Sequence, residues 1–361
     1  MINLQNFFGV SPYIFNKKDK RRVLNESLME LTRFHYEHCW QYKKILDGMG
    51  FDINNNKEYD ELPFLPVRLF KNFDLYSVPR ESIIKTMTSS GTSGQTVSKI
   101  YLDKYTSINQ SKALAKIVSS YIGFKRCPML IIDSESILKN RESFSARGAG
   151  ILGFSMFGSS RMFALNDKME IKYNEIISFL KENEGKTIFV FGFTFMIFLH
   201  FIQELKKKNM KFDISNGVLI HGGGWKKLSD QSITSIEFRR EVEKVSGIKS
   251  VHDYYGMVEQ VGSINMECEY GNLHTSIFSN IVIRRPNDFT IADVGEKGIV
   301  QTLSVLPASY PGHSLLTEDE GILLGEDDCK CGSLGKYFKI IGRIENAEIR
   351  GCSDTYTNEF K

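Results

Sequence analysis

Strand-like and helix-like patterns alternate regularly in the middle of the chain, and this alternation most strongly limits the possible folds. Short strand-like segments occur at 129–133, 187–192, 217–221 and 249–254. Segments with helical periodicity lie between them, near 171–183, 194–209 and 229–246. Successive parallel strands need crossover connections, which are usually helical and right-handed. The pattern therefore predicts an α/β fold with a buried parallel sheet.

Helical signals also precede this region. Residues 17–47 carry apolar side chains at helical spacing, and Gly48 is a natural stop. Asp103 has the character of an N-cap and predicts a helix through about Tyr121.

The pattern of apolar residues changes after Gly262. Helical periodicity disappears, and short β-like runs are separated by Gly, Asp and Pro, at 279–284, 298–305, 322–324 and 337–341. This pattern is typical of a small antiparallel subdomain. We therefore expect four consecutive parts: a helical N-terminal segment of the large domain at 1–85, an α/β core at 86–262, a β-rich subdomain at 263–341, and a short tail at 342–361.

Charge and composition exclude several classes of protein. The 361 residues include 46 basic and 43 acidic side chains, a net charge of +3, which gives no reason to expect a nucleic-acid partner. Six cysteines are too few for a disulfide scaffold. The first residues lack the features of a signal peptide. The most apolar stretch, 188–202, is shorter than the ~20 residues of a membrane span. We expect a cytoplasmic protein with no membrane span.

A Ser/Thr/Gly-rich segment at 88–98 could cradle phosphates. Seven of its eleven residues carry hydroxyls and two are glycines, which offers donors and a backbone that a ligand can approach closely. It lacks the Gly-Lys-Ser/Thr ending of a Walker loop. From composition alone, a solvated flexible loop is the favoured explanation of the segment, because Ser/Gly runs are common linkers.

Polar motifs follow the last two strands of the predicted parallel sheet. His221-Gly222-Gly223-Gly224-Trp225 comes after one strand, and Asp253-Tyr254-Tyr255-Gly256-Met257-Val258-Glu259 comes at the end of the next. Open α/β sheets bind ligands outside the carboxyl ends of their strands. Two further motifs stand later in the chain, Leu316-Thr317-Glu318-Asp319 and Gly342-Arg343-Ile344-Glu345.

Taken in order, these motifs resemble those of the adenylate-forming superfamily, which couples ATP to a carboxylate through an acyl-adenylate. Residues 88–103 and the tail at 342–354 also look like the acyl-protein synthetases of the bacterial fatty-acid reductase system, which are related to phenylacetate–CoA ligases. The resemblance covers most of the chain. It implies an adenylation domain with a mainly parallel sheet, a small β subdomain, and a C-terminal domain truncated to a short tail.

The resemblance also assigns ligands, with ATP and Mg²⁺ as cofactors. Glu259 would ligate magnesium, Asp319 would bind the ribose hydroxyls, and Arg343 would lie at the hinge and reach ribose or phosphate. Gly222, Gly223 and Tyr255 would line the adenine site. The loop Ser89, Ser90, Gly91, Thr92, Ser93 and Gly94 would hold the phosphates, and Thr88 and Gly256 would also belong to the ATP site.

Two departures from the family pattern concern the pyrophosphate leaving group. Many relatives place a lysine just after the phosphate loop, where this chain has Val97, with Lys99 next. In place of the usual C-terminal domain with its lysine, we expect only the short tail at 342–361.

Cys352 is the candidate nucleophile. The resemblance places it on a loop that enters the active site for thiol transfer, so its thiolate could accept the acyl group. The alternative is an incidental cysteine near a frayed terminus.

A second cysteine set suggests a metal site. Cys268 and His274 form one pair and Cys329 and Cys331 another. Three thiolates and an imidazole complete a tetrahedral zinc site with no open position, so zinc would be structural. Reduced thiols and a surface histidine are the alternative. Cys39 and Cys127 are expected to be small core residues.

Other residues have less specific signals. The aromatic run 189–201 could line a fatty-acyl pocket, although ordinary core explains such a stripe more simply. His200, His221 and His252 could act as bases, but adenylation needs none, so we expect structural or supporting roles.

The expected activity is ATP-dependent activation of a carboxylic acid, in particular a fatty acid, and transfer of its acyl group to Cys352. The thioester would pass to a partner such as an acyl reductase. One alternative is an acyl-CoA or aryl-CoA ligase with a free thiol as acceptor. Another is a zinc-stabilised scaffold without catalytic activity.

Overall fold

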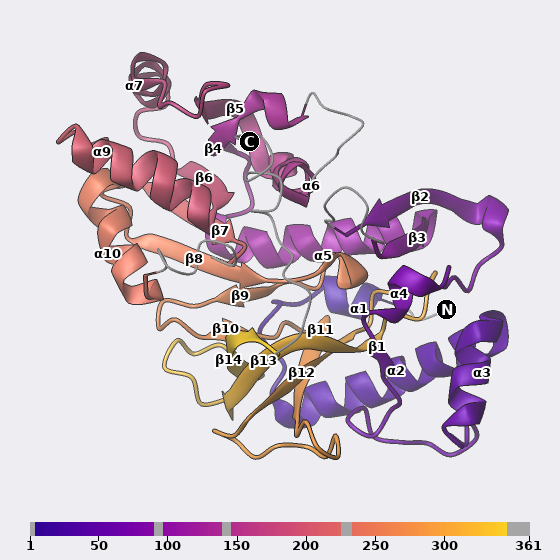
Figure 1. Ribbon diagram of the computed structural model, residues 1–361. Helices are drawn as coiled ribbons and strands as arrows, with labels where there is room; N and C mark the ends of the chain where they lie inside the picture. The colour runs from indigo at the N-terminus through magenta and orange to yellow at the C-terminus, as the bar shows by residue number, and fades with distance from the viewer. Residues whose placement is uncertain (1–3, 90–96, 139–145, 225–232, 345–361) are drawn as a thin grey trace. The chain divides into compact units, whose positions relative to one another are not determined.

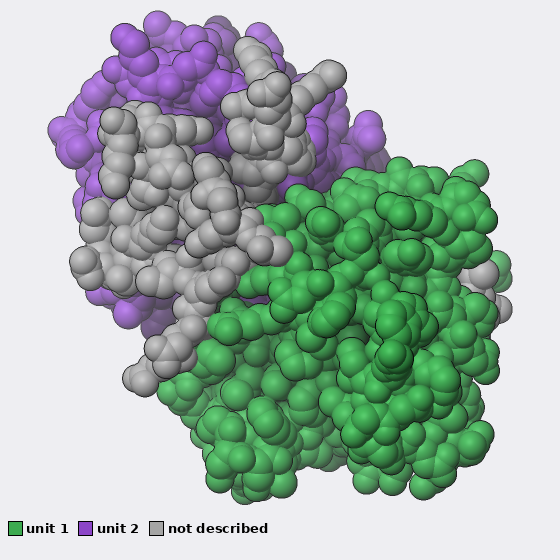
Figure 2. Space-filling model, turned by 45° about the vertical axis from the view of Figure 1, so that its right-hand side comes forward, with its two compact units in different colours: residues 1–89, 95–117, 256–348 green, residues 90–94, 118–255, 349–361 purple. Residues whose placement is uncertain are grey.

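The computed structural model describes residues 4–89, 97–138, 146–224 and 233–344. The chain forms two compact units, coloured separately in Figure 2. Unit 1 comprises residues 1–89, 95–117 and 256–348, and unit 2 comprises 90–94, 118–255 and 349–361. Each unit is assembled from segments distant in sequence. The division into four consecutive parts stays a prediction.

Unit 2 contains the predicted parallel sheet. Its strands run in the order β5-β4-β6-β7-β8, and every neighbouring pair is parallel. All residues of β4 and β6 are buried, as expected for strands covered on both faces. The strands are β4 (Cys127–Ser134), β5 (Gly158–Leu165), β6 (Ile188–Phe193), β7 (Gly217–Gly222) and β8 (Ser250–Tyr255).

The helices of unit 2 are α6 (Ala146–Phe154), α7 (Tyr173–Glu182), α8 (Thr194–Met196), α9 (Gln203–Lys207) and α10 (Ser235–Ser246). Helix α10 begins with a complete capping box, in which Thr234 and Glu237 satisfy each other's backbone donors. The predicted helix near 194–209 is present as a continuous helical run from Thr194 to Lys207, in which a π-helical turn at Ile197–Ile202 lies between α8 and α9. Apolar spacing locates the buried face but does not reveal such a local change in hydrogen bonding.

Unit 1 contains the predicted antiparallel sheet, in the strand order β11-β12-β13-β14-β10-β9 (Figure 1). Its strands are β9 (Asn265–Glu267), β10 (Leu273–His274), β11 (Ser279–Arg284), β12 (Lys297–Ser304), β13 (Ser314–Glu326) and β14 (Lys336–Arg343). The short strand β1 (Leu65–Pro66) pairs in parallel with β13. A separate antiparallel pair consists of β2 (Ile83–Thr88) and β3 (Lys99–Asp103).

The helical N-terminus of unit 1 is interrupted where the sequence predicts continuity. Helix α2 (Lys17–His38) and helix α3 (Trp40–Gly48) are separated by Cys39, which has an extended backbone. The Cys39 side chain is 1% exposed and packs in a core with Tyr42, Phe70 and Tyr310. Packing of the two helices against this core outweighs the uninterrupted local periodicity.

The remaining α-helices among the described residues are two short ones, α1 (Gln5–Phe8) and α4 (Leu69–Asn72), and the long α5 (Lys104–Ile122). The Asp103 carboxylate accepts the Thr106 backbone N–H at 2.8 Å, which confirms the predicted N-cap of α5. Cys39 and Cys127 are both buried, as expected of small core residues. No helix in the described ranges has the length and apolar character needed to cross a membrane.

Candidate functional site

Glu259 is a buried carboxylate in unit 1. It lies in a 3-10 turn, Val258–Gln260, and is 6% exposed. Burial raises the pKa of its carboxyl group, whereas the Ser98 hydroxyl and the positive charges of Lys71 and Arg343 act in the opposite direction. A carboxylate held out of water, with two cations nearby, is suited to bind a metal ion that carries anionic ligands.

The backbone around Glu259 is fixed by a buried loop. The Tyr310 hydroxyl donates to the Glu259 carbonyl at 2.9 Å, and Gln260 Nε2 donates to the Gly312 carbonyl at 2.8 Å. A Cβ added at Gly312 would lie 2.2 Å from the Tyr310 ring. Sequence reasoning missed Tyr310 and Gln260, because their contacts join segments about fifty residues apart.

Asp319 and Arg343 face each other across the β13–β14 pair. Their side chains form an ion pair with 3.4 Å between Arg343 Nε and Asp319 Oδ1. Glu318, the neighbour of Asp319, pairs with Arg68, and its carbonyl accepts the Ile344 N–H at 3.1 Å. Because the charge of Arg343 also acts on Glu259, unit 1 brings three of the predicted ATP-site residues into one electrostatic neighbourhood.

The Ser/Thr/Gly segment follows a strand that pairs with the strand after it. Thr88 ends β2 and Lys99 begins β3. The Ser89 N–H donates to the Ser98 carbonyl at 3.1 Å, and the Ser98 N–H donates to Ser89 Oγ at 2.9 Å. The predicted phosphate-binding residues Ser90, Gly91, Thr92, Ser93 and Gly94 lie outside the described residues.

Unit 2 holds the predicted adenine-site residues Gly222, Gly223 and Tyr255 at the carboxyl ends of β7 and β8, whereas Gly256 belongs to unit 1. A Cβ at Gly222 would come within 2.4 Å of the Tyr254 ring. Gly223 has φ +78°, a conformation that side chains other than glycine disfavour. Local packing at Gly222 and backbone conformation at Gly223 therefore each disfavour any residue other than glycine. The predicted nucleophile Cys352 lies outside the described residues.

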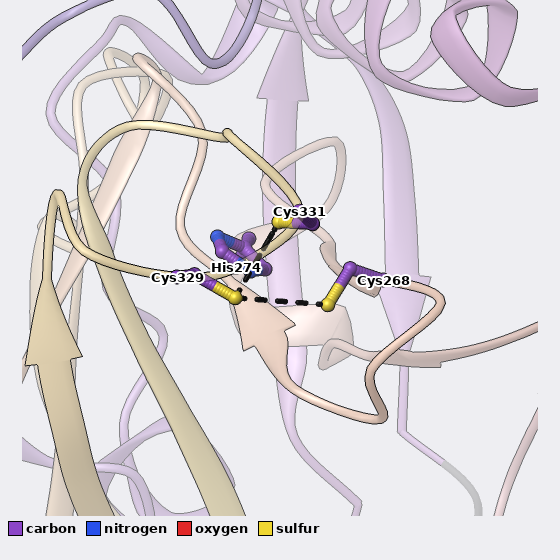
Figure 3. Close-up of side chains that lie close together, drawn as sticks. All are labelled: Cys268, His274, Cys329 and Cys331. Atoms are coloured by element: carbon purple, nitrogen blue, oxygen red, sulfur yellow. Dashed lines mark hydrogen bonds between the residues drawn. The ribbon is translucent and has the colours of Figure 1, made fainter.

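The four predicted metal ligands converge in unit 1 (Figure 3). One ligand atom from each of Cys268, His274, Cys329 and Cys331 lies within 4.8 Å of the others. Cys331 Sγ lies 3.4 Å from His274 Nε2 and 3.5 Å from Cys329 Sγ. Cys268 Sγ lies 4.0 Å from Cys329 Sγ. Two pairs about sixty residues apart thus form one compact donor set.

The protonation states of this set follow from burial. Burial lowers the pKa of His274 to about 4, so its imidazole is neutral at pH 7, the form that binds metals. Burial raises the pKa of Cys268 to about 12. At Cys329 burial also raises the pKa, but hydrogen bonds from the Cys331 backbone and from Asn272 outweigh it, and the net shift is downward.

The aromatic run 189–201 is mostly buried. Phe189, Phe191 and Phe195 have no exposed surface. A small cavity lies nearby, with an almost entirely apolar lining that includes Ile197, Phe201 and Val242. Burial favours the ordinary-core interpretation for the run.

Comparisons with known proteins identify the family. A family model described as "Acyl-protein synthetase, LuxE" matches residues 4–361. The chain belongs to this family. The match confirms the resemblance inferred from the motifs, and it makes the chain an enzyme of the ligase class with adenylate-forming chemistry.

Individual relatives agree with the family assignment. The chain is 23% identical to the long-chain-fatty-acid–luciferin-component ligase of Aliivibrio fischeri, over 97% of this chain and 92% of the relative. It is 20% identical to the ligase of the same name from Vibrio harveyi, over 98% and 92%. A phenylacetate–coenzyme A ligase of Thermus thermophilus is 33% identical over 22% of this chain and 19% of its own length.

The fold has solved counterparts. A 2-hydroxyisobutyryl-CoA ligase in its postadenylation state superposes with a TM-score of 0.70 at 14% identity, over 92% of this chain and 69% of the ligase. This similarity confirms the predicted α/β fold of adenylate-forming enzymes.

Proposed function

We propose that this enzyme uses ATP and Mg²⁺ to convert a long-chain fatty acid into an acyl-adenylate and then transfers the acyl group to its own Cys352. The observation that carries the proposal is the ion pair of Asp319 with Arg343 at 3.4 Å in unit 1, since the charge of Arg343 also acts on the buried carboxyl group of Glu259. The substrate is proposed from the names of the full-length relatives.

In the first half-reaction the residues bind and orient the reactants. Glu259 would hold Mg²⁺, which supplies positive charge to the phosphates. Asp319 would accept hydrogen bonds from the ribose hydroxyls, and Arg343 would reach ribose or phosphate. The segment 88–94 would offer hydroxyl and backbone donors to the phosphates, and Gly222, Gly223, Tyr255 and Gly256 would contact the adenine. No base is needed, because the fatty carboxylate is already ionised at pH 7.

In the second half-reaction a thiolate at Cys352 would attack the acyl carbon, and AMP would leave. An acyl-protein is the product that the family name describes. The thioester would then pass to a partner, such as an acyl reductase. Dependence on ATP and on a reduced thiol supports a cytoplasmic location.

A second candidate is a ligase that uses a free thiol such as coenzyme A. The local similarity to a phenylacetate–coenzyme A ligase favours this alternative. Free coenzyme A would then be acylated, and Cys352 would be dispensable. A non-catalytic scaffold is disfavoured by the retained Glu259, Asp319 and Arg343.

We also propose that Cys268, His274, Cys329 and Cys331 hold one structural zinc ion. The donor set fits, because three sulfurs and one imidazole within 4.8 Å suit tetrahedral Zn²⁺. His274 and Cys268 are both buried, and His274 Nε2 lies 3.4 Å from the Cys331 sulfur. A metal would satisfy such donors and join β9 and β10 to the loop before β14.

Fatty-acid-dependent exchange of pyrophosphate into ATP tests the first half-reaction. A panel of acids from acetate to octadecanoate should give exchange that increases with chain length. The release of acyl-coenzyme A is measured in parallel. Exchange with long chains and no coenzyme A product supports the proposal, whereas stoichiometric acyl-coenzyme A would favour the second candidate.

A further inference from the structure

Three polar side chains meet at the carboxyl ends of consecutive strands in unit 2. His221 lies in β7 and is 4% exposed. Its Nδ1 lies 2.9 Å from the Thr194 hydroxyl, at the start of α8, and 3.6 Å from Asp253 Oδ1, in β8. The third neighbour is the Phe238 ring of α10, at a centroid distance of 4.6 Å. The imidazole is thus bordered by a hydroxyl, a carboxylate and an apolar ring.

These contacts select one tautomer. The Thr194 hydroxyl donates its only proton to the Gly222 carbonyl at 3.3 Å, so its oxygen is left to accept from His221. Asp253 Oδ1 is also an acceptor and lies on the same side of the ring. Both neighbours therefore favour a proton on Nδ1 and leave the lone pair on Nε2. The nearby carboxylate would stabilise the imidazolium that forms when Nε2 gains a proton.

We propose that His221, supported by Asp253, is the general base that deprotonates the acceptor thiol in the second half-reaction. The proposal rests on the proposed function, since it needs a thiol acceptor. Acyl transfer to a thiol, unlike adenylation, must remove a proton, and an imidazole suits this role near pH 7. His221 directly precedes Gly222 and Gly223, the residues proposed to contact the adenine of the acyl-adenylate.

The step balances without a further reactant. The S–H bond of the thiol breaks, and its proton moves to His221 Nε2. The sulfur electron pair forms the S–C bond to the acyl carbon. The bond between the acyl carbon and the phosphate oxygen breaks, AMP leaves with that electron pair, and the imidazolium later returns its proton to water.

The other histidines of unit 2 have different surroundings. His252 lies in β8, with Nε2 2.9 Å from the Ser250 hydroxyl and its ring edge-on to Tyr121. The ring of His200, in the π-helical turn, is more than half buried, and this burial lowers its pKa. His252→Gln is thus a matched control for His221→Gln, since both remove an imidazole from a neighbouring strand of one sheet.

The experiment separates the half-reactions in full-length enzyme. Acyl-adenylate formed from Mg-ATP and a long-chain fatty acid is trapped with hydroxylamine, which needs no enzymic base. Transfer to the protein thiol is followed in a single turnover by intact mass. His221→Gln should form hydroxamate within about threefold of wild type, and its acyl transfer should slow about 10²-fold. His252→Gln should match wild type in both assays.

Transfer by His221→Gln at the wild-type rate would overturn the proposal, and so would equal losses in both half-reactions. If wild-type enzyme gives no hydroxamate, the proposed function fails instead. If hydroxamate forms but no protein thiol is acylated, the acceptor assignment fails, and the same comparison is made with coenzyme A as the thiol.

Asp253→Asn provides a second variant that leaves the buried ring in place. The Asp253 side chain is 43% exposed, so its support is partly screened and its effect on rate should be several-fold. The Asp253 charge stabilises the imidazolium, and Asp253→Asn removes that stabilisation. The rate of transfer should therefore reach its plateau at lower pH in Asp253→Asn. An unchanged pH profile would contradict the pairing.

Discussion

The two units place their site residues by different routes. In unit 2, Gly222, His221 and Asp253 lie at the carboxyl ends of parallel strands. Ligand sites form at these ends, so the order of strands along the chain is enough to predict where the site lies. In unit 1, Asp319 and Arg343 meet through antiparallel pairing, and Glu259 is held by a buried loop that contains Tyr310. The comparison teaches that parallel strands make a site predictable from chain order, whereas the antiparallel unit relies on long-range contacts.

If unit 1 supplies the charged part of the ATP site, the largest effect should come from Glu259→Gln. Loss of a metal-binding charge should lower fatty-acid-dependent pyrophosphate exchange about 10³-fold, or ~4 kcal/mol. The exposed Glu182→Gln in unit 2 is the control and should exchange normally. Near wild-type exchange in Glu259→Gln, with an unchanged melting temperature, would remove Glu259 from the site.

The metal proposal predicts a stability effect that unit 2 does not share. Cys329→Ser or Cys331→Ser should remove the zinc and lower the melting temperature by about 10 °C, because structural zinc contributes directly to folding. Cys39→Ser, which alters a core thiol in the same unit, should lower it less. Metal analysis of wild type purified without chelator should find one zinc per chain, and its absence would count against the site.

A smaller effect should follow from Asp319→Asn. The change removes the charge that pairs with Arg343 and weakens the proposed ribose contact, so KM for ATP should increase about tenfold. Glu320→Gln, on the same strand but paired with Lys297, is the matched control. Equal KM values for ATP in Asp319→Asn and Glu320→Gln would show that Asp319 does not bind the nucleotide.

Acid should destabilise unit 1 by a modest amount through its buried histidines. His35 and His313 stack 5.0 Å apart, and burial lowers the pKa of His35 to about 3 and that of His313 well below 6.5. The unfolded chain binds these protons near pH 6.5, so stability should fall as pH drops below that value. Hydrogen exchange in peptides of α2 should accelerate between pH 6.5 and 5. The exchange rates are corrected for the pH dependence of intrinsic amide exchange. No acceleration after this correction would contradict the predicted destabilisation by His35 and His313.

The sequence predicted parallel pairing for β4, β6, β7 and β8, the antiparallel character of β11 to β14 and the Asp103 N-cap, because each depends on local pattern. It did not predict β5. It also predicted the Cys/His set, since few residue types bind zinc. It missed the break at Cys39 and the π-helical turn, where packing outweighs periodicity. It also missed Tyr310 and Gln260, because their contacts join segments about fifty residues apart and leave no local signal.

The most direct measurement of the central claim is the intact mass of the enzyme after incubation with Mg-ATP and a long-chain fatty acid. Wild type should gain the mass of one acyl group, and neutral hydroxylamine should remove it, as expected of a thioester. Cys352→Ser should still form acyl-adenylate but gain no acyl mass, because a serine hydroxyl is a far weaker nucleophile. Acyl mass on Cys352→Ser, or full turnover of that variant with free coenzyme A, would contradict the account.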